Sequence, residues 1–308
     1  MGRREEGVRP GSRQSVLAVF IFSLVSFGTA GVWVSRIDLP SWDIVLYRSG
    51  IGGAFILLVF LLTRQKPAGP AHRKDLGIVF LSGMAQGVSW IFLHTAYQEI
   101  GAGLGTIAYY CGPIAVMFLS PLLFREKMTW WKAGTFLAVV FGMILVNLEA
   151  LESGKTQYGI FAGLMSAVFL AVMLILYKKA RHIGGFEGSL IQIAGCFTVV
   201  FLFVLSKEGL PRPVPGGSLP WMLILALFNT GIAWCAYYGA VAKLPVQTVS
   251  ILGYLEPLSA VIWGALVLGE SMSGLQAAGA LLILGGAVLS EVLPAILGWW
   301  HRSGVRER

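Results

Sequence analysis

The chain has few charged residues. Asp, Glu, Lys and Arg make up only 12% of its 308 residues, whereas hydrophobic residues make up 56%. An ordinary soluble domain carries roughly 25% charged residues, so this chain has too few charges to cover a globule in water. Apolar runs of about 20 residues, each long enough to cross about 30 Å of hydrocarbon, recur along it. The composition therefore predicts an integral membrane protein and argues against a soluble domain.

Cysteine and histidine are also scarce, with 3 and 4 residues respectively. The cysteines, Cys111, Cys196 and Cys235, fall inside apolar runs and have no metal-type spacing. The sequence therefore predicts no disulfide framework, no metal site and no cofactor. An intramembrane enzyme would need a nucleophile with its base, paired aspartates or a histidine-rich metal site within the spans. None of these patterns is present in the sequence, so we do not expect an enzyme.

The hydrophobic pattern predicts ten membrane-spanning helices. Their expected ranges are about 15–35, 43–62, 76–98, 102–123, 131–148, 158–178, 186–206, 220–240, 245–268 and 274–293. Of the 23 Lys and Arg residues, eighteen lie on the side of the N-terminus, Arg48 lies inside a span, and four lie on the opposite side. The positive-inside rule then places both termini in the cytoplasm. This distribution explains the net charge of +8 without a nucleic-acid partner.

Two stretches of the chain resemble each other. YCGPIAVMFLSPLLFRE begins at Tyr110, and YLEPLSAVIWGALVLGE begins at Tyr254, 144 residues later. The same shift superimposes further pairs, namely Trp90 and Trp234, Ala96 and Ala240, Pro113 and Pro257, Glu126 and Glu270, Met128 and Met272, and Gly142 and Gly286. It carries spans three to five onto spans eight to ten. Each half then has five spans, and an odd number means that the second half is inserted in the opposite orientation.

The predicted fold is therefore an all-α integral membrane protein with ten transmembrane helices in two inverted five-helix repeats. Its expected parts are an N-terminal tail (1–14), a first repeat (15–148), an external linker (149–157), a second repeat (158–293) and a C-terminal tail (294–308). Inverted repeats are typical of secondary transporters, which expose a site near the membrane midplane to each side in turn. The alternative interpretation is an old duplication that was kept for packing alone.

Several short motifs add to the repeat. They are the two Y-x-x-P helices that end in Glu, the small-residue stretch LQAAGALLILGGAVL, FGTAGVW at 27–33 and YRSG at 47–50. Together they resemble the EamA-type transporters of the drug/metabolite transporter superfamily, over roughly residues 15–293. The resemblance implies a central cavity lined by spans one, three, four, six, eight and nine, and the last span of each half at the periphery or a dimer interface. It also implies metabolite export, a structural or gating role for Arg48, a monomer or homodimer, and a location in the bacterial inner membrane.

Aromatic and hydrogen-bonding residues gather in four of the predicted spans. In span three they recur at intervals of four, four and three residues, which places them on one face of a helix. The full set of predicted substrate-binding residues is Gln86, Trp90, His94, Tyr97, Tyr109, Tyr110, Asn229, Trp234, Tyr237, Tyr238 and Tyr254. Their rings favour an amphipathic solute or an organic cation. Alternatively, the rings pack between helices with their polar atoms satisfied. His94 is then a neutral hydrogen-bonded imidazole rather than a protonatable group of the site.

Glu256 is the only carboxylate placed well inside a predicted span. It lies 13 residues beyond Lys243, or about 20 Å of helix from the cytoplasmic end. A charge at that depth costs at least about 2.5 to 3.5 kcal/mol unless it is hydrated, paired or protonated. We therefore expect Glu256 either to be neutral in a structural hydrogen bond or to act as a coupling group that exchanges a proton for solute. Its counterpart in the first half is Gly112.

Pro113 and Pro257 are predicted to kink spans four and nine at equivalent depths, which frees carbonyls near Tyr109 and near Leu252 or Gly253. Arg48 is the only basic residue within a span, where it either snorkels to the interface or serves in gating. The sequence thus predicts a secondary active transporter for a small zwitterionic or cationic metabolite, with an amino acid as the leading candidate. Its expected partners are the small-molecule substrate, the lipid bilayer and protons. The alternative is an uncoupled facilitator or channel for small uncharged solutes or drugs.

Overall fold

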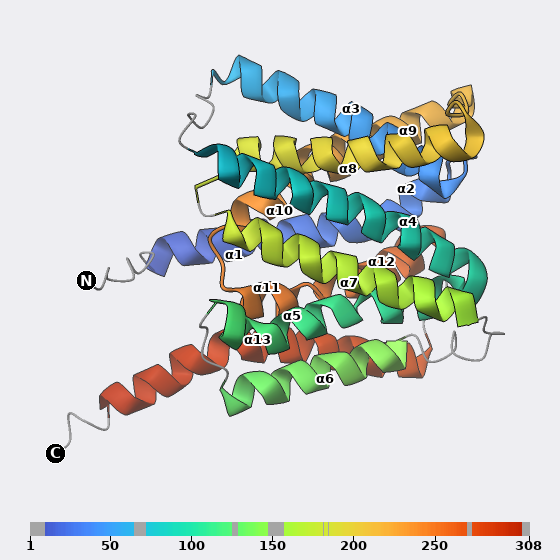
Figure 1. Ribbon diagram of the computed structural model, residues 1–308. Coiled ribbons are helices and arrows are strands. Elements are labelled where there is room, and N and C mark those ends of the chain that lie inside the picture. The colour runs from blue at the N-terminus through green and yellow to red at the C-terminus, as the bar shows by residue number, and fades with distance from the viewer. Residues whose placement is uncertain are drawn as a thin grey trace.

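The computed structural model of the chain is a bundle of helices packed side by side (Figure 1). It describes residues 10–64, 72–124, 129–146, 157–180, 182–183, 185–269 and 273–303. Every regular element within these residues is a helix, which confirms the predicted all-α class. Seven segments of the described chain are long and apolar enough to cross a membrane, and two shorter apolar helices cover Ala133–Leu145 and Ala277–Gly286.

The helices of the first half begin with a broken pair. They are α1 (Pro10–Gly28), α2 (Ala30–Val34), α3 (Ser41–Leu62), α4 (Arg73–Tyr109), α5 (Cys111–Phe124) and α6 (Trp130–Val146). The second half contains α7 (Gln157–Lys179), α8 (Gly185–Glu208), η3 (Gly216–Ser218), α9 (Leu219–Ile224), the π-helix η4 (Leu225–Ala233), α10 (Trp234–Val241), α11 (Val246–Leu252), α12 (Leu255–Trp263), η5 (Gly264–Leu268) and α13 (Gly274–Ser303). The start of α1 and the end of α13 lie at the same end of the bundle, on the left in Figure 1.

The outer surface of the bundle is apolar. Leu62, Leu122 and Leu281 are 72%, 79% and 71% exposed, and many other large hydrophobic side chains also face outward. A soluble protein rarely exposes so much apolar surface, whereas lipid solvates it well. Inside, Ser23 and Ser166 are fully buried, and their hydroxyls donate to backbone carbonyls of their own helices. The protein is therefore a multi-pass membrane protein.

Glycines bring two pairs of helices into close contact. A Cβ atom added at Gly83 of α4 would collide with the Gln192 carbonyl oxygen of α8, and one added at Gly195 of α8 would collide with the Phe80 carbonyl oxygen of α4. Small residues of this kind allow membrane helices to pack backbone to backbone.

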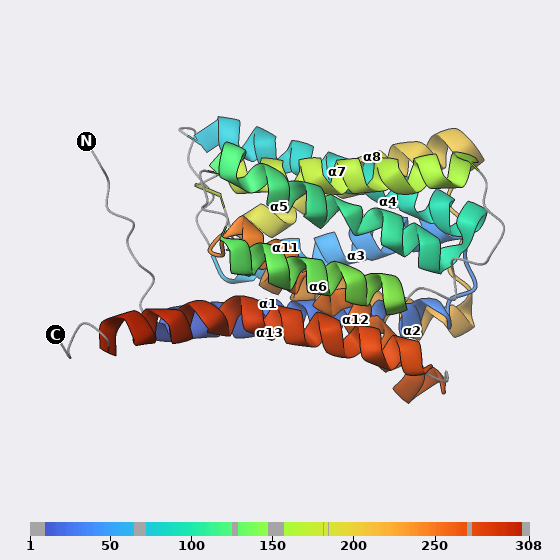
Figure 2. The same ribbon diagram turned by 90° about the horizontal axis from the view of Figure 1, so that it is seen from below.

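The contact between α6 and α13, which lie together in Figure 2, follows the same principle and is reciprocal. A Cβ atom at Gly142 would meet the Gly279 carbonyl and Ile283, whereas one at Gly286 would meet the Thr135 carbonyl and Val139. The neighbours of Gly286 become the neighbours of Gly142 when the 144-residue shift is applied.

Helix α4 differs from the sequence prediction. We expected spans three and four to be separated near residues 99–101, but α4 stays helical through Tyr109. Its 37 residues would extend about 55 Å if straight, longer than the hydrocarbon thickness. Figures 1 and 2 show that it bends at the end opposite the start of α1 before the chain enters α5. In the second half Pro245 separates α10 from α11, whereas the first half has Gly101 at that position, so nothing there removes the backbone donor.

The two prolines also act differently from the prediction. Spans four and nine are broken rather than kinked, since α5 begins at Cys111 and α12 at Leu255. Pro113 and Pro257 therefore lie in the first turn of a new helix, where the missing N–H has no partner to lose. Of the two carbonyls predicted to be free near Pro257, at Leu252 or Gly253, that of Gly253 accepts a hydrogen bond from the Glu256 N–H at 3.1 Å.

Candidate functional site

A cavity of about 540 Å³ lies in the middle of the bundle. It extends from Ser250 and Glu256 to Val34 and Ser41, at the end of the bundle opposite the start of α1 (Figure 1). Its volume falls within the range of about 300 to 1,000 Å³ that is typical of small-molecule sites. The predicted site residues that line it are Arg48, Gln86, Trp90, His94, Tyr109, Tyr110, Pro113, Trp234, Tyr237, Tyr238, Glu256 and Pro257.

Two predicted substrate-binding residues, Tyr254 and Asn229, do not line the cavity. The Tyr254 side chain is 1% exposed, and its hydroxyl donates to the Tyr110 carbonyl at 2.8 Å. Asn229 is fully buried, and its Nδ2 donates to the Ser26 carbonyl at 2.6 Å. Both side chains form hydrogen bonds between helices and do not line the cavity. The side chain of Tyr97 lies outside the described residues.

Asn229 instead supports a pair of irregular segments. It lies in the π-helix η4, and its Nδ2 also contacts Thr29 Oγ1 at 3.2 Å, at the break between α1 and α2. Segments of π-helix occur frequently at functional sites. The amide of Asn229 therefore fixes η4 against the α1–α2 break. It supports the helices around the cavity without lining the cavity itself.

An aromatic cluster forms one side of the cavity. Its members are Phe27, Trp90, Trp234, Tyr237 and Tyr238. The ring centroids of Trp90 and Trp234 are 5.4 Å apart, and those of Trp234 and Tyr238 are 5.1 Å apart. The ring centroid of Phe27 is 6.1 Å from that of Trp234 and 5.5 Å from that of Tyr237. These distances are typical of favourable aromatic pairs, so the rings pack on one another and also face the cavity.

Glu256 lines the cavity at the start of a helix. Because α12 begins at Leu255, the carboxylate lies in its first turn, where the helix dipole and the exposed N–H groups favour a negative charge. The Tyr110 hydroxyl donates a hydrogen bond to this carboxylate, and the Arg48 guanidinium interacts with it electrostatically. The break in span nine thus places the acid that the sequence singles out at the cavity.

Arg48 also lines the cavity, from α3. Its Nε donates to Thr230 Oγ1 of η4 at 3.0 Å, and its guanidinium lies over the Trp90 ring, 5.1 Å from the centroid. The hydrogen bond and the cation–π contact hold this half-buried positive charge in one orientation. These two contacts direct the guanidinium toward the cavity.

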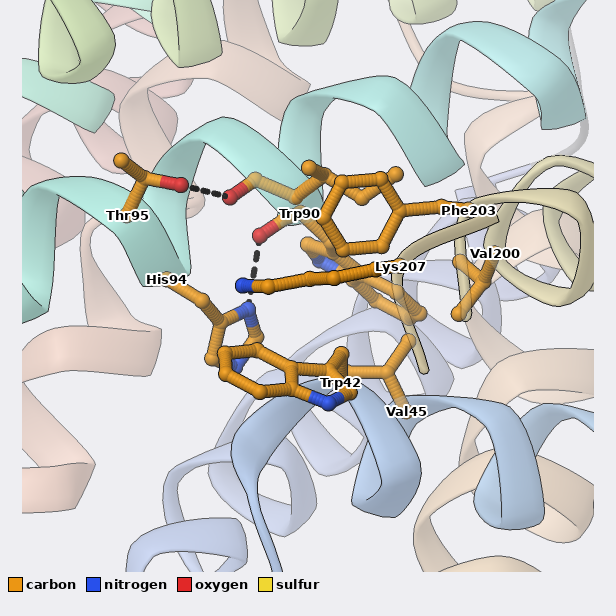
Figure 3. Close-up of a pocket in the computed structure, with 9 residues that line it drawn as sticks. Trp42, Val45, Trp90, His94, Thr95, Val200, Phe203 and Lys207 are labelled. Atoms are coloured by element: carbon orange, nitrogen blue, oxygen red, sulfur yellow. Dashed lines mark hydrogen bonds between the residues drawn. The ribbon is translucent and has the colours of Figure 1, made fainter. Parts of the chain in front are cut away.

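His94 separates the cavity from a small neighbouring pocket of about 20 Å³. Figure 3 shows its imidazole beside Trp90, whose carbonyl is 2.6 Å from Nδ1. Because a carbonyl can only accept, Nδ1 carries the proton in this arrangement. The Lys207 side chain also lines the small pocket, and its amine lies 3.7 Å from the centroid of the Trp42 ring (Figure 3).

Three polar side chains of the cavity contain buried atoms that have no hydrogen-bond partner in the structure. These atoms are Gln86 Nε2, Trp234 Nε1 and Ser250 Oγ. A buried donor without a partner costs about 1 to 3 kcal/mol, so a polar solute or water that reaches these groups is favoured. The sequence prediction missed Ser250, because one serine in an apolar helix is usually satisfied by its own backbone.

One glycine of α1 and one of α2 also belong to the site and were not predicted as lining residues. Gly28 and Gly31 both line the cavity. A Cβ atom at Gly28 would collide with Ser259 of α12, whereas one at Gly31 would meet only open space. Gly28 thus allows α1 to approach the helix that carries Glu256.

Comparison with known proteins identifies the family. The family model described as "EamA-like transporter family" matches residues 14–148 and again residues 157–291. The chain belongs to the EamA-like transporter family. An uncharacterized transporter of Bacillus subtilis, YxxF, is 22% identical over 91% of both chains. The pseudopaline exporter CntI of Pseudomonas aeruginosa is 26% identical over 90% of this chain and 94% of that one. One solved crystal structure shares the fold at a TM-score of 0.78 and 18% identity, over 92% of this chain and 100% of that chain.

Membership of the EamA-like transporter family points to membrane transport rather than to catalysis. The helices around the cavity largely match those implied by the sequence resemblance, since α1, α4, α5, α7, α10, α11 and α12 all contribute residues. There is one addition. Helix α3, in span two, contributes Ser41, Val45 and Arg48. A positive charge therefore belongs to the cavity as well as a negative one.

Proposed function

We propose that this EamA-like protein is a secondary transporter that moves a small zwitterionic metabolite, with an amino acid as the leading candidate, by alternating access. The observation that carries the proposal is the pair of opposite charges in one cavity, Arg48 and Glu256. A zwitterion presents a carboxylate that a guanidinium can bind and an ammonium that a carboxylate can bind. A solute with a single charge would pair with only one of the two groups.

The aromatic cluster supports an amphipathic solute. Trp90, Trp234 and Tyr237 offer ring faces to an ammonium group or to an apolar side chain. The small cavity volume and the single arginine argue against large dianionic solutes such as nucleotide sugars, which would need several basic groups.

We further propose that ten spans form two inverted five-helix repeats, with both termini in the cytoplasm of a bacterial cell and the protein in its inner membrane. The two separate matches to the family model support this arrangement. So do the reciprocal contacts of Gly142 and Gly286, and the contacts that Trp90 makes with Trp234 and Tyr110 with Tyr254, since residues near a pseudo-twofold axis meet their own counterparts. With this orientation the cavity faces the outside, because it extends to the end opposite the start of α1.

Glu256 is proposed as the coupling group. Its carboxylate can bind either the ammonium of the solute or a proton, so the two compete for one site as the cavity opens to each side. Export is the proposed direction, supported by the name of the relative from Pseudomonas aeruginosa as an exporter. Monomer and homodimer are both compatible with this mechanism.

The test is a counterflow screen of amino acids, amines and nucleosides with purified protein in proteoliposomes. Vesicles loaded with excess unlabelled solute should take up the same labelled solute transiently, and the effect should be confined to zwitterions. Stimulation by nucleosides or amines alone would contradict the proposed substrate class. A thermal-shift screen with the same solutes is an independent check, because a bound ligand raises apparent stability.

The alternative function is an uncoupled facilitator or channel for small uncharged solutes or drugs. The apolar part of the cavity, including Leu24, Leu93 and Met173, is the observation that favours it. Flux through a channel would rise linearly with concentration and show no counterflow.

A further inference from the structure

A second group of chemically active side chains lies far from the cavity. His72 and Asp75 are at the start of α4, and His182 is in the connection between α7 and α8. Each residue offers one ligand atom, and the three atoms all lie within 4.8 Å of one another. Sequence analysis predicted no metal site, and this cluster is not evident from residue spacing because Asp75 and His182 are 107 residues apart.

The three side chains are in contact with one another. His182 Nδ1 is 2.7 Å from Asp75 Oδ2, and the His182 backbone N–H donates to the same oxygen at 3.2 Å. The rings of His72 and His182 are stacked, with centroids 4.7 Å apart and an interplanar angle of 23°. Two imidazoles bound to one tetrahedral zinc have centroids about 5 Å apart, given Zn–N bonds of about 2.0 to 2.1 Å. Because stacked rings do not direct their nitrogen lone pairs to one point, the His72 ring must turn relative to the His182 ring before all three ligand atoms can bind one cation.

We propose that His72, Asp75 and His182 form a binding site for a divalent transition-metal cation of the Zn²⁺ class. Two imidazole nitrogens and one carboxylate oxygen are a donor set that zinc and its neighbours in the first transition row prefer, whereas Mg²⁺ and Ca²⁺ prefer oxygen ligands alone. Three protein ligands leave a fourth tetrahedral position for water or an exchangeable ligand. The cation is expected to exchange readily with solvent, because the His182 side chain is 63% exposed and that of Asp75 is 18% exposed.

A cation at this site would link two parts of the helix bundle. It would join the start of α4, which carries Gln86, Trp90 and His94 into the cavity, to the connection between α7 and α8. These helix ends lie at the same end of the bundle as the start of α1, opposite the end that the cavity reaches (Figure 1). A bound cation therefore stabilises the packing of these elements by mass action.

The experiment is a titration of the full-length, detergent-purified protein with ZnCl₂, measured by isothermal titration calorimetry after removal of bound metals with a chelator. The protein carries an affinity tag without histidine. We expect saturable binding of one Zn²⁺ per chain and no response to MgCl₂. The variants H72Q, H182Q and D75N should each weaken binding at least about tenfold. The matched control is H301Q, which removes a histidine elsewhere in the chain. It should bind Zn²⁺ like the wild type.

Cobalt provides a second readout that a merely structural His182–Asp75 pair would not give. Co²⁺ bound at this site should develop the visible absorption of a tetrahedral complex in the wild type and in H301Q, but not in H72Q. Zn²⁺ binding that is absent from the wild type, or equally strong in H72Q and H182Q, would overturn the proposal. Each variant should elute as a single species in size-exclusion chromatography. This control shows that weaker binding results from the lost ligand and not from misfolding. Transport plays no part in these titrations, so failure here leaves the proposed transport function intact.

Discussion

The two Tyr-x-x-Pro segments share a helix break but differ in their chemistry. The break falls at Tyr110 in the first segment and at Gly253 and Tyr254 in the second. Just past the first break, Gly112 packs so closely on α7 that a Cβ atom would lie 2.8 Å from the Ala167 carbonyl oxygen. Just past the second, Glu256 lines the cavity. The break is thus common architecture, whereas the carboxylate belongs to one half alone.

A second charged position differs between the two halves, and here the charge, Arg48, is in the first half. The guanidinium of Arg48 lines the cavity, whereas Gln192, its counterpart 144 residues later, is fully buried and donates to the Tyr238 hydroxyl at 2.6 Å. Each half therefore contributes one charge to the cavity at a position where the other half has a neutral residue. In the proposed mechanism, symmetric helices provide the two states and asymmetric side chains provide the chemistry.

The largest expected effect comes from Glu256→Gln. This change keeps the size of the side chain and removes its charge and its exchangeable proton, so pH-driven accumulation of solute should be lost. The measurement is uptake into proteoliposomes under an imposed pH gradient. Asp38→Asn is the matched control, since Asp38 is an exposed carboxylate between α2 and α3. Undiminished pH-driven uptake by Glu256→Gln would remove Glu256 from the coupling step.

Arg48→Lys tests the other charge. Lysine keeps the positive charge but loses the Nε hydrogen bond to Thr230 and the planar contact with Trp90. We expect Arg48→Lys to weaken the free energy of solute binding by about 1.4 kcal/mol. The half-saturating solute concentration should then be about tenfold higher. Initial rates of exchange at increasing solute concentration measure it. An unchanged half-saturating concentration would show that the orientation of the guanidinium does not matter for binding.

Gly112→Ala tests whether the first break is a packing site. The added methyl group meets the Ala167 backbone and Leu170, and crowding of this kind costs about 1 to 3 kcal/mol. Thermal unfolding in detergent should therefore begin at a lower temperature. Gly134→Ala is the control, because a Cβ atom there meets nothing within 4 Å. Equal melting temperatures for the two variants would contradict the close packing of α5 on α7.

Tyr254→Phe should have the smallest effect. It removes the hydrogen bond that links the two breaks, from the Tyr254 hydroxyl to the Tyr110 carbonyl, and such a bond contributes about 1 kcal/mol. We expect a modest fall in thermal stability and unchanged solute selectivity. Tyr158→Phe, at a tyrosine that is 57% exposed, provides the reference for loss of a solvated hydroxyl. A change in selectivity would mean that Tyr254 contacts solute after all.

Much of the fold could be predicted from composition and pattern. Long apolar runs have few alternatives to membrane helices, so the helical class followed directly. Glu256 was singled out by its distance along the chain from Lys243, and its side chain lines the cavity, although the helix break at Gly253 and Tyr254 was not expected. The continuation of α4 through Tyr109 could not be predicted, because an apolar run without Pro has the same pattern whether the helix bends or ends.

For the candidate site, the feature that could not be predicted from the sequence was the direction in which each side chain points. Asn229 has the polarity expected of a cavity residue, yet its amide donates to Ser26 on the neighbouring helix. Tyr254 is likewise used between helices, whereas Arg48 turns into the cavity through its contact with Trp90. The His72, Asp75 and His182 cluster arises from contacts between distant segments, which residue spacing does not reveal. The sequence identified candidate residue types, and tertiary packing decided which of them face the solute.

The most direct test of the central proposal is amino-acid counterflow through wild-type protein and Glu256→Gln in matched proteoliposomes. The proposed carrier mechanism predicts saturable, transiently concentrative uptake of labelled amino acid by the wild type. It also predicts strongly reduced pH sensitivity in the variant. Linear, non-saturating flux without counterflow, equal in both proteins, would contradict the mechanism.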